Sequence, residues 1–219
     1  GQSRGVAAMS PVILIGGGGH CRSAIDVIEA EGCHHIIGVL EQPSFVSSEV
    51  LGYPVLGADD DLSRFVVDGV GVLVTMGQIK TAEIRARAFI AAKIAGASQP
   101  AIVSPRAHVS RHARVSAGTI VMHGAVVNAG CEIGENCIVN SMALVEHDVA
   151  VGDHTHIATG ARVNGGVTIG PRCFIGSGAV LHNDIEIGEG AIIPAGALVR
   201  SSVSTTRSSS VEGRGAAHG

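Results

Sequence analysis

The sequence predicts an α/β fold followed by an all-β fold. We expect a Rossmann-like parallel βαβ domain over residues 9–100, a parallel β-helix of hexapeptide repeats over 101–200, and a C-terminal tail over 201–219. Three observations predict this organisation: a six-residue aliphatic period in the second half, alternating strands and helices in the first half, and an aromatic content of only 2%. A core without large rings has to be filled by small aliphatic residues in a regular arrangement, which is typical of repeat proteins.

The aliphatic period runs without interruption through the second half. Every sixth residue from Val103 to Val199 is Val, Ile or Leu, and the residue four positions after each is mostly small. One large and one small inward position in every six residues is the pattern of a hexapeptide β-helix. Each repeat then forms a short strand and a corner, and three repeats form one triangular coil.

Glycines and cysteines follow the same period. A row of glycines recurs every 18 residues, at Gly134, Gly152, Gly170 and Gly188. We expect this row to stack along one corner, where the turn requires a positive φ. Three of the five cysteines occupy the small inward position, and no C-x-x-C pair occurs, so the cysteines are predicted to be reduced core residues.

The first half alternates between strands and helices. Residues 11–32 read as a buried strand, a glycine turn and a helix that ends near Gly32. A second strand is predicted over 34–40, a third within 69–77, and a second helix over 81–96 with Thr81 at its N-cap. This alternation predicts a small parallel sheet with helices on its faces.

The glycine turn "GGGGH" is a candidate phosphate site. Glycines allow main-chain N–H groups at a helix N-terminus to approach an anion, so Gly17, Gly18, Gly19 and His20 are predicted to bind nucleotide phosphates. Glu41 lies where a ribose-binding acid is expected. Cys21 replaces the last small residue of the dinucleotide fingerprint. A mononucleotide or nucleotide sugar is favoured over a dinucleotide, because only half of the doubly wound fold fits in the available ~90 residues. A tight turn with a purely structural role is the alternative.

The stretch "VNSMALVEHDVAVGDHTHIATG" (139–160) gathers charged residues and histidines within aliphatic sequence. With Val145 inward, Glu146 and His147 fall on a corner. His154 and His156 flank an inward Thr155, so both are expected to point outward. A zinc site requires three or four convergent ligands, so proton transfer by His147 is favoured over metal binding, and a solvated face is the remaining interpretation.

The glycine turn joined to a hexapeptide helix that carries "NSMALVEHD" resembles the acetyl-CoA-dependent sugar acetyltransferases related to sialic acid O-acetyltransferases and UDP-4-amino-sugar N-acetyltransferases. The resemblance covers about residues 11–200 and implies a left-handed β-helix and a homotrimer with active sites between adjacent prisms. It also implies acetyl-CoA as the co-substrate, a nucleotide-linked amino sugar as the acceptor, and no metal. The family's closing V-x-G-x-P-A element is altered, since Gly215 replaces the proline.

The resemblance and the repeat together assign roles to individual residues. His147 is predicted to be the general base, with Asp148 or Glu146 accepting its other ring N–H, and Asp148 is the better match to the family pattern. Gly165 lies one coil after His147, where its missing side chain leaves room for a thioester and its N–H for an oxyanion. The resemblance places Asn140 and His156 beside the acceptor sugar, and main chain near Gly165 and Ala195 along the cofactor.

Composition limits the other function classes. A formal net charge of −4 with 16% charged residues argues against nucleic-acid or membrane-surface binding. No apolar run is long enough to span a bilayer and no signal peptide is evident, so a cytoplasmic protein is expected. Three alternatives stay open: an O-acetyltransferase acting on sialic acid or a related sugar hydroxyl, a non-catalytic nucleotide-sugar-binding protein, and a nicotinamide oxidoreductase.

Overall fold

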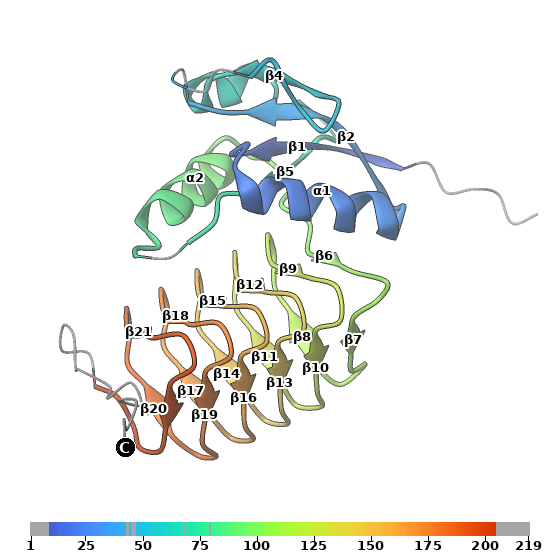
Figure 1. Cartoon of the computed structure of the whole chain (residues 1–219). Coiled ribbons are helices and arrows are strands. Elements are labelled where there is room, and N and C mark those ends of the chain that lie inside the picture. Colours follow the sequence, from blue (N-terminus) through green and yellow to red (C-terminus); the bar gives the residue numbers. More distant parts are fainter. Residues whose placement is uncertain (1–8, 43, 45–46, 68, 79, 205–219) are drawn as a thin grey trace, which may run out of the picture. The chain divides into compact units, whose positions relative to one another are not determined.

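The computed structural model describes residues 9–204 except 43, 45–46, 68 and 79. The chain divides into two compact units: residues 1–77 with 88–100, and residues 78–87 with 101–219. Figure 1 shows the elements of both units along the chain. The segment 78–87 belongs to the second unit, although its sequence reads as part of the first domain.

The first unit is built on a five-stranded sheet with the order β3-β4-β2-β1-β5. Its strands are β1 (Ser10–Ile15), β2 (His34–Leu40), β3 (Glu49–Val50), β4 (Tyr53–Gly57) and β5 (Gly71–Val74). All neighbouring strands are parallel except β3 and β4, which form an antiparallel pair. The three predicted strands are therefore present, and the short β3–β4 pair is an addition that the sequence pattern did not predict.

Two helices follow strands of this sheet, and residues 83–87 of the second helix belong to the second unit. Helix α1 (Gly19–Glu31) ends at Gly32, whose φ of 67° is the left-handed conformation expected at a helix C-terminus. Helix α2 (Glu83–Ile94) begins after Thr81, whose hydroxyl accepts the Glu83 N–H at 3.2 Å. A 3-10 helix, η1 (Asp59–Arg64), follows β4. Both predicted helices are confirmed, and α1 buries its Ala24, Val27 and Ile28 side as expected.

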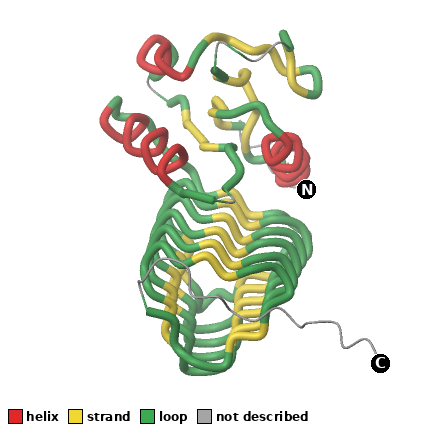
Figure 2. The backbone as a smooth tube through the Cα atoms, turned by 60° about the vertical axis from the view of Figure 1, so that its left-hand side comes forward, coloured by secondary structure: helices red, strands yellow, loops and turns green. Residues whose placement is uncertain are grey.

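The second unit is a triangular prism of stacked coils (Figure 2). Its first face contains β6 (Ile102–Val103), β9 (Ile120–Val121), β12 (Ile138–Val139), β15 (His156–Ile157), β18 (Phe174–Ile175) and β21 (Ile192–Ile193). Its second face contains β7 (His108–Val109), β10 (Val126–Val127), β13 (Leu144–Val145), β16 (Arg162–Val163), β19 (Val180–Leu181) and β22 (Leu198–Val199). Its third face contains β8 (Arg114–Val115), β11 (Glu132–Ile133), β14 (Ala150–Val151), β17 (Thr168–Ile169) and β20 (Glu186–Ile187).

The chain turns at three edges of this prism. The first edge joins the first face to the second, the second edge joins the second face to the third, and the third edge returns to the first face. Each strand from β6 to β19 pairs in parallel with the strand 18 residues further on, as Leu144 does with Arg162. A given position therefore recurs in every coil directly above itself.

The inside of the prism follows the predicted period. The second residue of each strand points inward, and the small position carries Cys131, Cys137 and Cys173, which are buried and not disulfide-bonded. Threonine also occupies this position twice. The hydroxyls of Thr119 and Thr155 donate to the carbonyls of Gly134 and Gly170, so these buried polar groups are satisfied.

The positive φ angles lie at a different position from the one predicted. They occur at every sixth residue from Gly118 to Gly196, and Gly134, Gly152, Gly170 and Gly188 are not among them. The prediction of a positive φ for that glycine row is wrong. The row instead allows close approach between coils, because a Cβ on Gly152 would lie 2.5 Å from the Pro171 nitrogen.

The described part of the tail continues the prism. Val203 pairs in parallel with Ile187 of β20, so the chain returns to the third face after β22. The altered element around Gly215 lies outside the described residues. Among the residues that the structure describes, no helix is long and apolar enough to cross a membrane.

The glycine row provides a stability test. In Gly152→Ala the added methyl group would clash with the main chain of Gly170 and Pro171 in the next coil, which cannot move without displacing that coil. We therefore expect the Tm of the prism to fall by roughly 5 °C or more. Gly160→Asn is the matched control, because Gly160 has a φ of 66° with open space around it and asparagine tolerates this conformation. Thermal unfolding followed by circular dichroism measures both, and equal losses would contradict the close-approach explanation.

Candidate active site

His147 and Asp148 form a contact at the second edge, in the turn between β13 and β14. The Nδ1 atom of His147 lies 2.9 Å from Oδ2 of Asp148. Since a carboxylate oxygen only accepts, Nδ1 carries the proton and Nε2 presents a lone pair. Asp148 adopts a φ of 59°, an uncommon conformation for a residue other than glycine. The structure therefore brings together the two residues that the sequence pairs as base and orienting acid.

Glu146 has a different partner. Its Oε2 accepts a hydrogen bond from Nδ2 of Asn128, one coil before, at 2.8 Å. Glu146 is adjacent to His147 in sequence but bonds along its own column, so Asp148 is the carboxylate that contacts the imidazole. This geometry decides between the two acids that the sequence left as candidates for orienting the ring.

Gly165 lies directly against the imidazole. A Cβ on Gly165 would be 2.6 Å from Nε2 of His147 and 2.7 Å from its Cε1. The next residue, Gly166, donates its N–H to the His147 carbonyl at 3.0 Å. The predicted stacking of Gly165 on His147 is present, but the imidazole ring occupies the space left by the missing side chain, which the sequence analysis had assigned to a thioester.

The charges around His147 favour its protonated form. The hydrogen bond with Asp148 raises the pKa of His147 above its ordinary value, and the charges of Asp148, Glu146 and Asp184 add to the effect. The side chain is 64% exposed, so solvent screens these charges. An imidazole that is stabilised on protonation can accept a proton and hold it.

Asp184 is a residue of this edge that the sequence reasoning missed. It has a φ of 58°, and a Cβ on Gly166, one coil before, would contact its Oδ1. The same relation holds two coils earlier in this column, where a Cβ on Gly130 would contact Oδ1 of Asp148. The alternation of glycine and aspartate at an 18-residue spacing was the signal in the sequence that could have revealed it.

Asn140 and His156 lie together elsewhere on the prism. His156 is on the first face and Asn140 is at the first edge, with 3.0 Å between Asn140 Nδ2 and His156 Nε2. His156 points out of the prism core, as predicted, but it is only 7% exposed. The expectation of an outward histidine did not foresee this burial, which arises because the segment 78–87 covers the ring: the Gln78 carbonyl lies 2.9 Å from its Nδ1.

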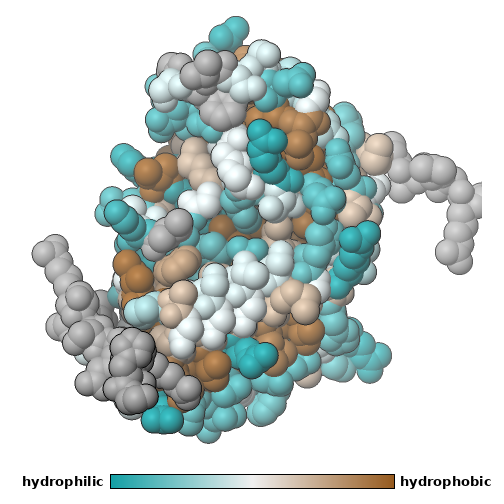
Figure 3. Space-filling view, in the orientation of Figure 1, coloured by the Kyte–Doolittle hydropathy of each residue, from teal (hydrophilic) through white to brown (hydrophobic). Residues whose placement is uncertain are grey.

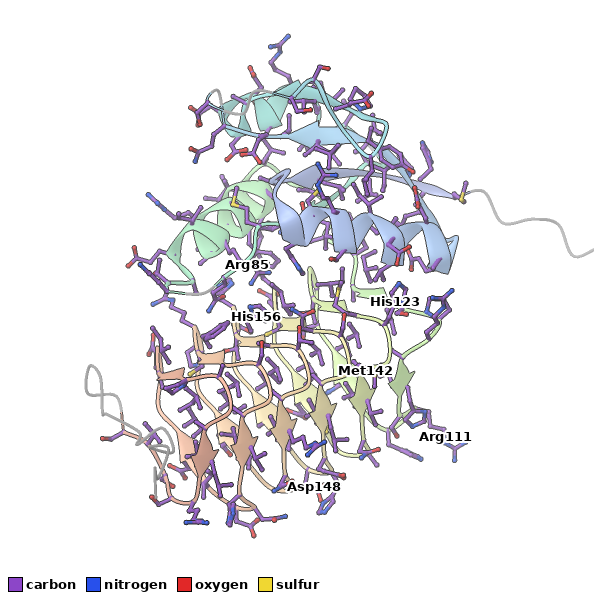
Figure 4. The ribbon with its side chains drawn as sticks, viewed as in Figure 1. Arg85, Arg111, His123, Met142, Asp148 and His156 are labelled. Atoms are coloured by element: carbon purple, nitrogen blue, oxygen red, sulfur yellow. The ribbon has the colours of Figure 1, made fainter. Side chains whose placement is uncertain are left out.

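The predicted site residues of the prism therefore occupy two edges. His147, Asp148 and Gly165 share the second edge, whereas Asn140 and the exposed Ala195 lie at the first edge. Figure 4 shows Asp148 and His156 on opposite parts of the prism. A single chain does not bring the two groups together, because the second face lies between them.

The glycine turn of the first unit holds Glu41. One carboxylate oxygen of Glu41 accepts the Gly17 N–H, and the other accepts the Gln42 N–H at 2.8 Å. Gly16 has a φ of 101°, and a Cβ there would lie 2.5 Å from Met76 Cγ, so this glycine is required by the fold itself. Glu41 thus lies beside the turn as the sequence predicts, with both of its oxygens bonded to main chain.

Gly18 and Gly19 are not required by the packing of the first unit. A Cβ on either residue would meet no atom within 4 Å, and neither has a positive φ. They precede or begin helix α1, which continues through His20. The space beside these two glycines, at a helix N-terminus, is compatible with the close approach of an anionic group.

No metal site is present in the part of the chain that the structure describes. Groups of three or more His, Cys, Asp or Glu residues with the arrangement of metal ligands do not occur there. Asp153, His154 and His156, which the sequence places near one another, do not converge. His154 instead contacts Asn136, whose Nδ2 lies 3.0 Å from its Nδ1.

Comparisons with known proteins agree with this architecture. Residues 11–89 match the family model of the PglD N-terminal domain, and residues 166–201 match the bacterial transferase hexapeptide model. The perosamine N-acetyltransferase PerB of Caulobacter crescentus, solved with CoA and GDP-perosamine, has a TM-score of 0.83 and 31% identity, covering 91% of this chain and 93% of PerB. The chain belongs to the hexapeptide-repeat sugar acetyltransferases.

A second acetyltransferase structure supports the same assignment. The acetyltransferase domain of PglB from Neisseria gonorrhoeae, in complex with acetyl coenzyme A, has a TM-score of 0.83 and 28% identity over 90% of this chain and 94% of that one. This sugar acetyltransferase therefore uses acetyl-CoA as its co-substrate and has the left-handed β-helix of its family. WeeI from Acinetobacter baumannii, 22% identical with a TM-score of 0.78, shares the fold. No curated protein matches the chain significantly by sequence.

The His147–Asp148 contact predicts a pH effect. Asp148 raises the pKa of His147 by stabilising the protonated ring, so Asp148→Asn should lower that pKa. If His147 acts as a general base, it works in its neutral form, so the acid limb of the kcat/KM profile should move to lower pH in this acetyltransferase variant. Glu146→Gln is the control, and its acid limb should move less. An unchanged limb in Asp148→Asn would mean that Asp148 does not act on the base.

Proposed function

We propose that this enzyme acetylates the amine of a nucleotide-linked amino sugar of the UDP-4-amino-sugar type, with His147 as the general base. The observation that carries the proposal is the imidazole of His147, whose Nδ1 is bonded to Asp148 and whose Nε2 lies over Gly165. The relative PerB, which is an amino-sugar N-acetyltransferase solved with a nucleotide-linked amino sugar, supports the class of acceptor.

The reaction follows from this placement. The amine nitrogen attacks the thioester carbonyl carbon of acetyl-CoA and forms the new C–N bond. Nε2 of His147 accepts the proton that the nitrogen loses, and Asp148 stabilises the resulting imidazolium. The C–S bond then breaks, and the CoA sulfur leaves as the thiol after it receives the proton from His147. No electrons are exchanged, so the chemistry requires no redox cofactor.

Gly165 is proposed to serve the cofactor. Gly166 donates its N–H to the His147 carbonyl, and the N–H of the preceding Gly165 is proposed to donate to a thioester oxygen. Ala195 is proposed to line the cofactor arm from the first edge of a neighbouring copy. Asn140 is proposed to face the acceptor from that same edge, with the buried His156 behind it on the first face.

Replacement of the proposed base tests the mechanism. His147→Ala should lower kcat by roughly 10²- to 10⁴-fold, the usual contribution of a positioned base. Affinities for acetyl-CoA and for the nucleotide sugar, measured by calorimetry, should stay within a few fold of the parent, because both ligands are held elsewhere. His182→Ala, a substitution in the neighbouring column, is the control. Loss of activity after EDTA treatment that zinc restores would contradict the proposal.

The acceptor itself is identified by a panel. Acetyl transfer should be measured by mass spectrometry on UDP- and GDP-linked amino sugars and on free sialic acids. Acetylation of a nucleotide-linked amine supports the proposal, and the preferred nucleotide decides between the UDP type and the GDP type. Acetylation of a sialic acid hydroxyl alone would overturn the proposal in favour of an O-acetyltransferase.

The glycine turn is proposed to hold the nucleotide. The Glu41 carboxylate lies beside Gly17 and would repel a phosphate there, so the phosphates are placed over Gly18, Gly19 and His20. The open space beside Gly18 and Gly19 supports this placement. Glu41 is proposed to act mainly by holding the turn through the Gly17 N–H, and also to border the ribose.

Gly18→Val tests the nucleotide site. A side chain on Gly18 meets no atom of the first unit, so the Tm should stay close to that of the parent. The branched side chain would occupy the space in front of the main-chain amides, so KM for the nucleotide sugar should rise at least tenfold while KM for acetyl-CoA barely changes. A parallel rise of both KM values would show that the turn has only a structural role.

We also propose a homotrimer with sites between copies. The two groups of site residues lie at the edges that border the second face, so a neighbouring copy packed there would bring one copy's His147 toward another copy's Asn140. Four of the six outward strand residues of this face are apolar, namely Val126, Leu144, Val180 and Leu198, and the other two are His108 and Arg162. Apolar residues, interrupted by polar ones, gather on the visible side of the prism (Figure 3).

The trimer is tested by placing a charge on this face. Leu198→Glu should reduce the mass measured by sedimentation from three copies to one, with loss of activity, because a buried carboxylate whose neighbour in the column is Val180 opposes association. Thr168→Glu is the control on the exposed third face and should remain trimeric. A parent protein that sediments as a monomer, or equal effects of both substitutions, would overturn the proposal.

A further inference from the structure

The segment 78–87 is attached to the prism by buried polar side chains. Nε2 of Gln78 donates to the Cys173 carbonyl at 3.1 Å, and Nη2 of Arg85 donates to Oδ1 of Asn136 at 3.0 Å. Asn136 returns a hydrogen bond from its Nδ2 to the Arg85 carbonyl at 3.3 Å. All three side chains are at most 2% exposed. The main chain at Gln78 is therefore held in one place on the first face.

This attachment determines which atoms carry the protons in the hydrogen bonds that link Gln78, His156 and Asn140. The Gln78 carbonyl can only accept, so Nδ1 of His156 carries a proton and donates to it at 2.9 Å. At the other end the Ser141 N–H can only donate, so the atom of Asn140 facing it at 2.8 Å is Oδ1. Nδ2 of Asn140 must then donate to Nε2 of His156 at 3.0 Å. This last bond requires a neutral His156 ring.

These hydrogen bonds fix the orientation of the Asn140 amide, which leaves one of its N–H groups available to donate. Its amide group has two N–H bonds, and one is directed at His156. Among the described residues, no acceptor is bonded to the second N–H, and Asn140 is half-buried at the first edge. Because the amide can neither flip nor rotate without losing both of its bonds, the second N–H points in one direction.

Arg85 has an unusual environment for a cation. It is 1% exposed, burial lowers the pKa of its guanidinium to about 10, and no carboxylate bonds to it within the described residues. Its Nε has no hydrogen-bond partner there. A buried charge without a counter-ion destabilises a fold, so its presence requires another explanation. Figure 4 shows Arg85 near His156, where a positive charge opposes protonation of the ring.

We infer that Gln78 and Arg85 are positioning residues of the acetyl-transfer site: they hold His156 as the neutral, Nδ1-protonated tautomer, so that Asn140 presents one N–H to an oxygen atom of the bound substrates. The inference rests on the proposed function, because it assigns Asn140 to that site. Gln78 acts by fixing the carbonyl that accepts from Nδ1. Arg85 acts through its hold on Asn136 and through its charge.

The surroundings of His156 agree with this role. Burial lowers the pKa of His156 to about 4, with the Arg85 charge acting in the same direction and the hydrogen bond to Gln78 opposing it. The neighbouring His154 has its pKa lowered by burial and contributes no fixed charge, and Phe174 packs edge-on against the ring at 5.2 Å. The buried thiol of Cys137, with a pKa raised to about 12 by burial, stays neutral.

The tautomer can be observed directly. In full-length protein labelled with ¹⁵N-histidine, the ring resonances of His156, assigned with His156→Gln, should show a neutral Nδ1–H form from pH 8 down to about pH 5. Arg85→Met should raise the pKa of His156, because it removes the positive charge that opposes protonation of the ring. Arg87→Met, which removes an exposed charge from the same helix, should leave it in place. An Nε2–H tautomer in the parent, or equal effects of the two substitutions, would overturn the inference.

A second variant covers the case in which Arg85→Met does not fold. Gln78→Met keeps the shape of the side chain and loses both of its hydrogen bonds, so His156 should populate both tautomers and kcat/KM should fall roughly tenfold. An unchanged tautomer with unchanged kcat/KM would refute the role of Gln78. The ring resonances of His156 are measured without an acceptor sugar, so they test the tautomer independently of the proposed function. A parent that shows the Nδ1–H form but acetylates no nucleotide-linked amine would therefore contradict the proposed function and leave the tautomer assignment standing.

Discussion

The distance between coils is the constraint on which the prism and its active edge depend. Parallel strands in successive coils lie about 4.8 Å apart, and each residue pairs with the one 18 positions later. That spacing is too small for two large side chains of successive coils to occupy the same column when one of them leans along the prism axis. Gly165 faces the ring of His147, Gly130 faces Asp148, and Gly166 faces Asp184. The geometry of the candidate site is therefore a set of large side chains that each occupy space left by a glycine.

The positive φ angles at the corners contribute to the same arrangement. The fold imposes this conformation at every sixth residue, and most of these positions are glycine. Asp148 occupies one of them, although such a conformation costs a residue with a side chain about 1–3 kcal/mol. In this conformation the carboxylate of Asp148 lies beside the imidazole ring of the preceding residue, His147.

Much of this structure could be predicted from the sequence because the prism repeats. A period of six specifies which residues face inward, and a period of 18 specifies which residues stack, so Gly165 could be placed against His147 from spacing alone. Adjacency alone did not identify the partner of His147, because Glu146 and Asp148 are both adjacent to it, and the preference for Asp148 came from the family pattern.

Features that depend on contacts between distant, non-repeating segments could not be predicted in this way. Periodicity shows that His156 leaves the prism core, but it carries no information about what covers the ring. The covering residues, Gln78 and Arg85, lie in a segment with no repeat of its own. The short pair of strands β3 and β4 likewise depends on a partner strand and on turn residues that give only a weak local pattern. The role of the glycine row was mistaken because close approach and a positive φ both select glycine.

The pairing of each large side chain with a glycine limits how many reactive groups one edge can hold. Where a side chain leans along the prism axis, as His147 does against Gly165, the same column cannot carry a second large side chain in the next coil, whereas Asn128 and Glu146 stack in successive coils and bond to each other. Chemistry that needs several side chains at one point has to recruit them from adjacent columns, as His147 and Asp148 do, or from another surface altogether. The design of a new active site on such a prism would therefore begin with the choice of the positions that are kept as glycine next to each leaning side chain.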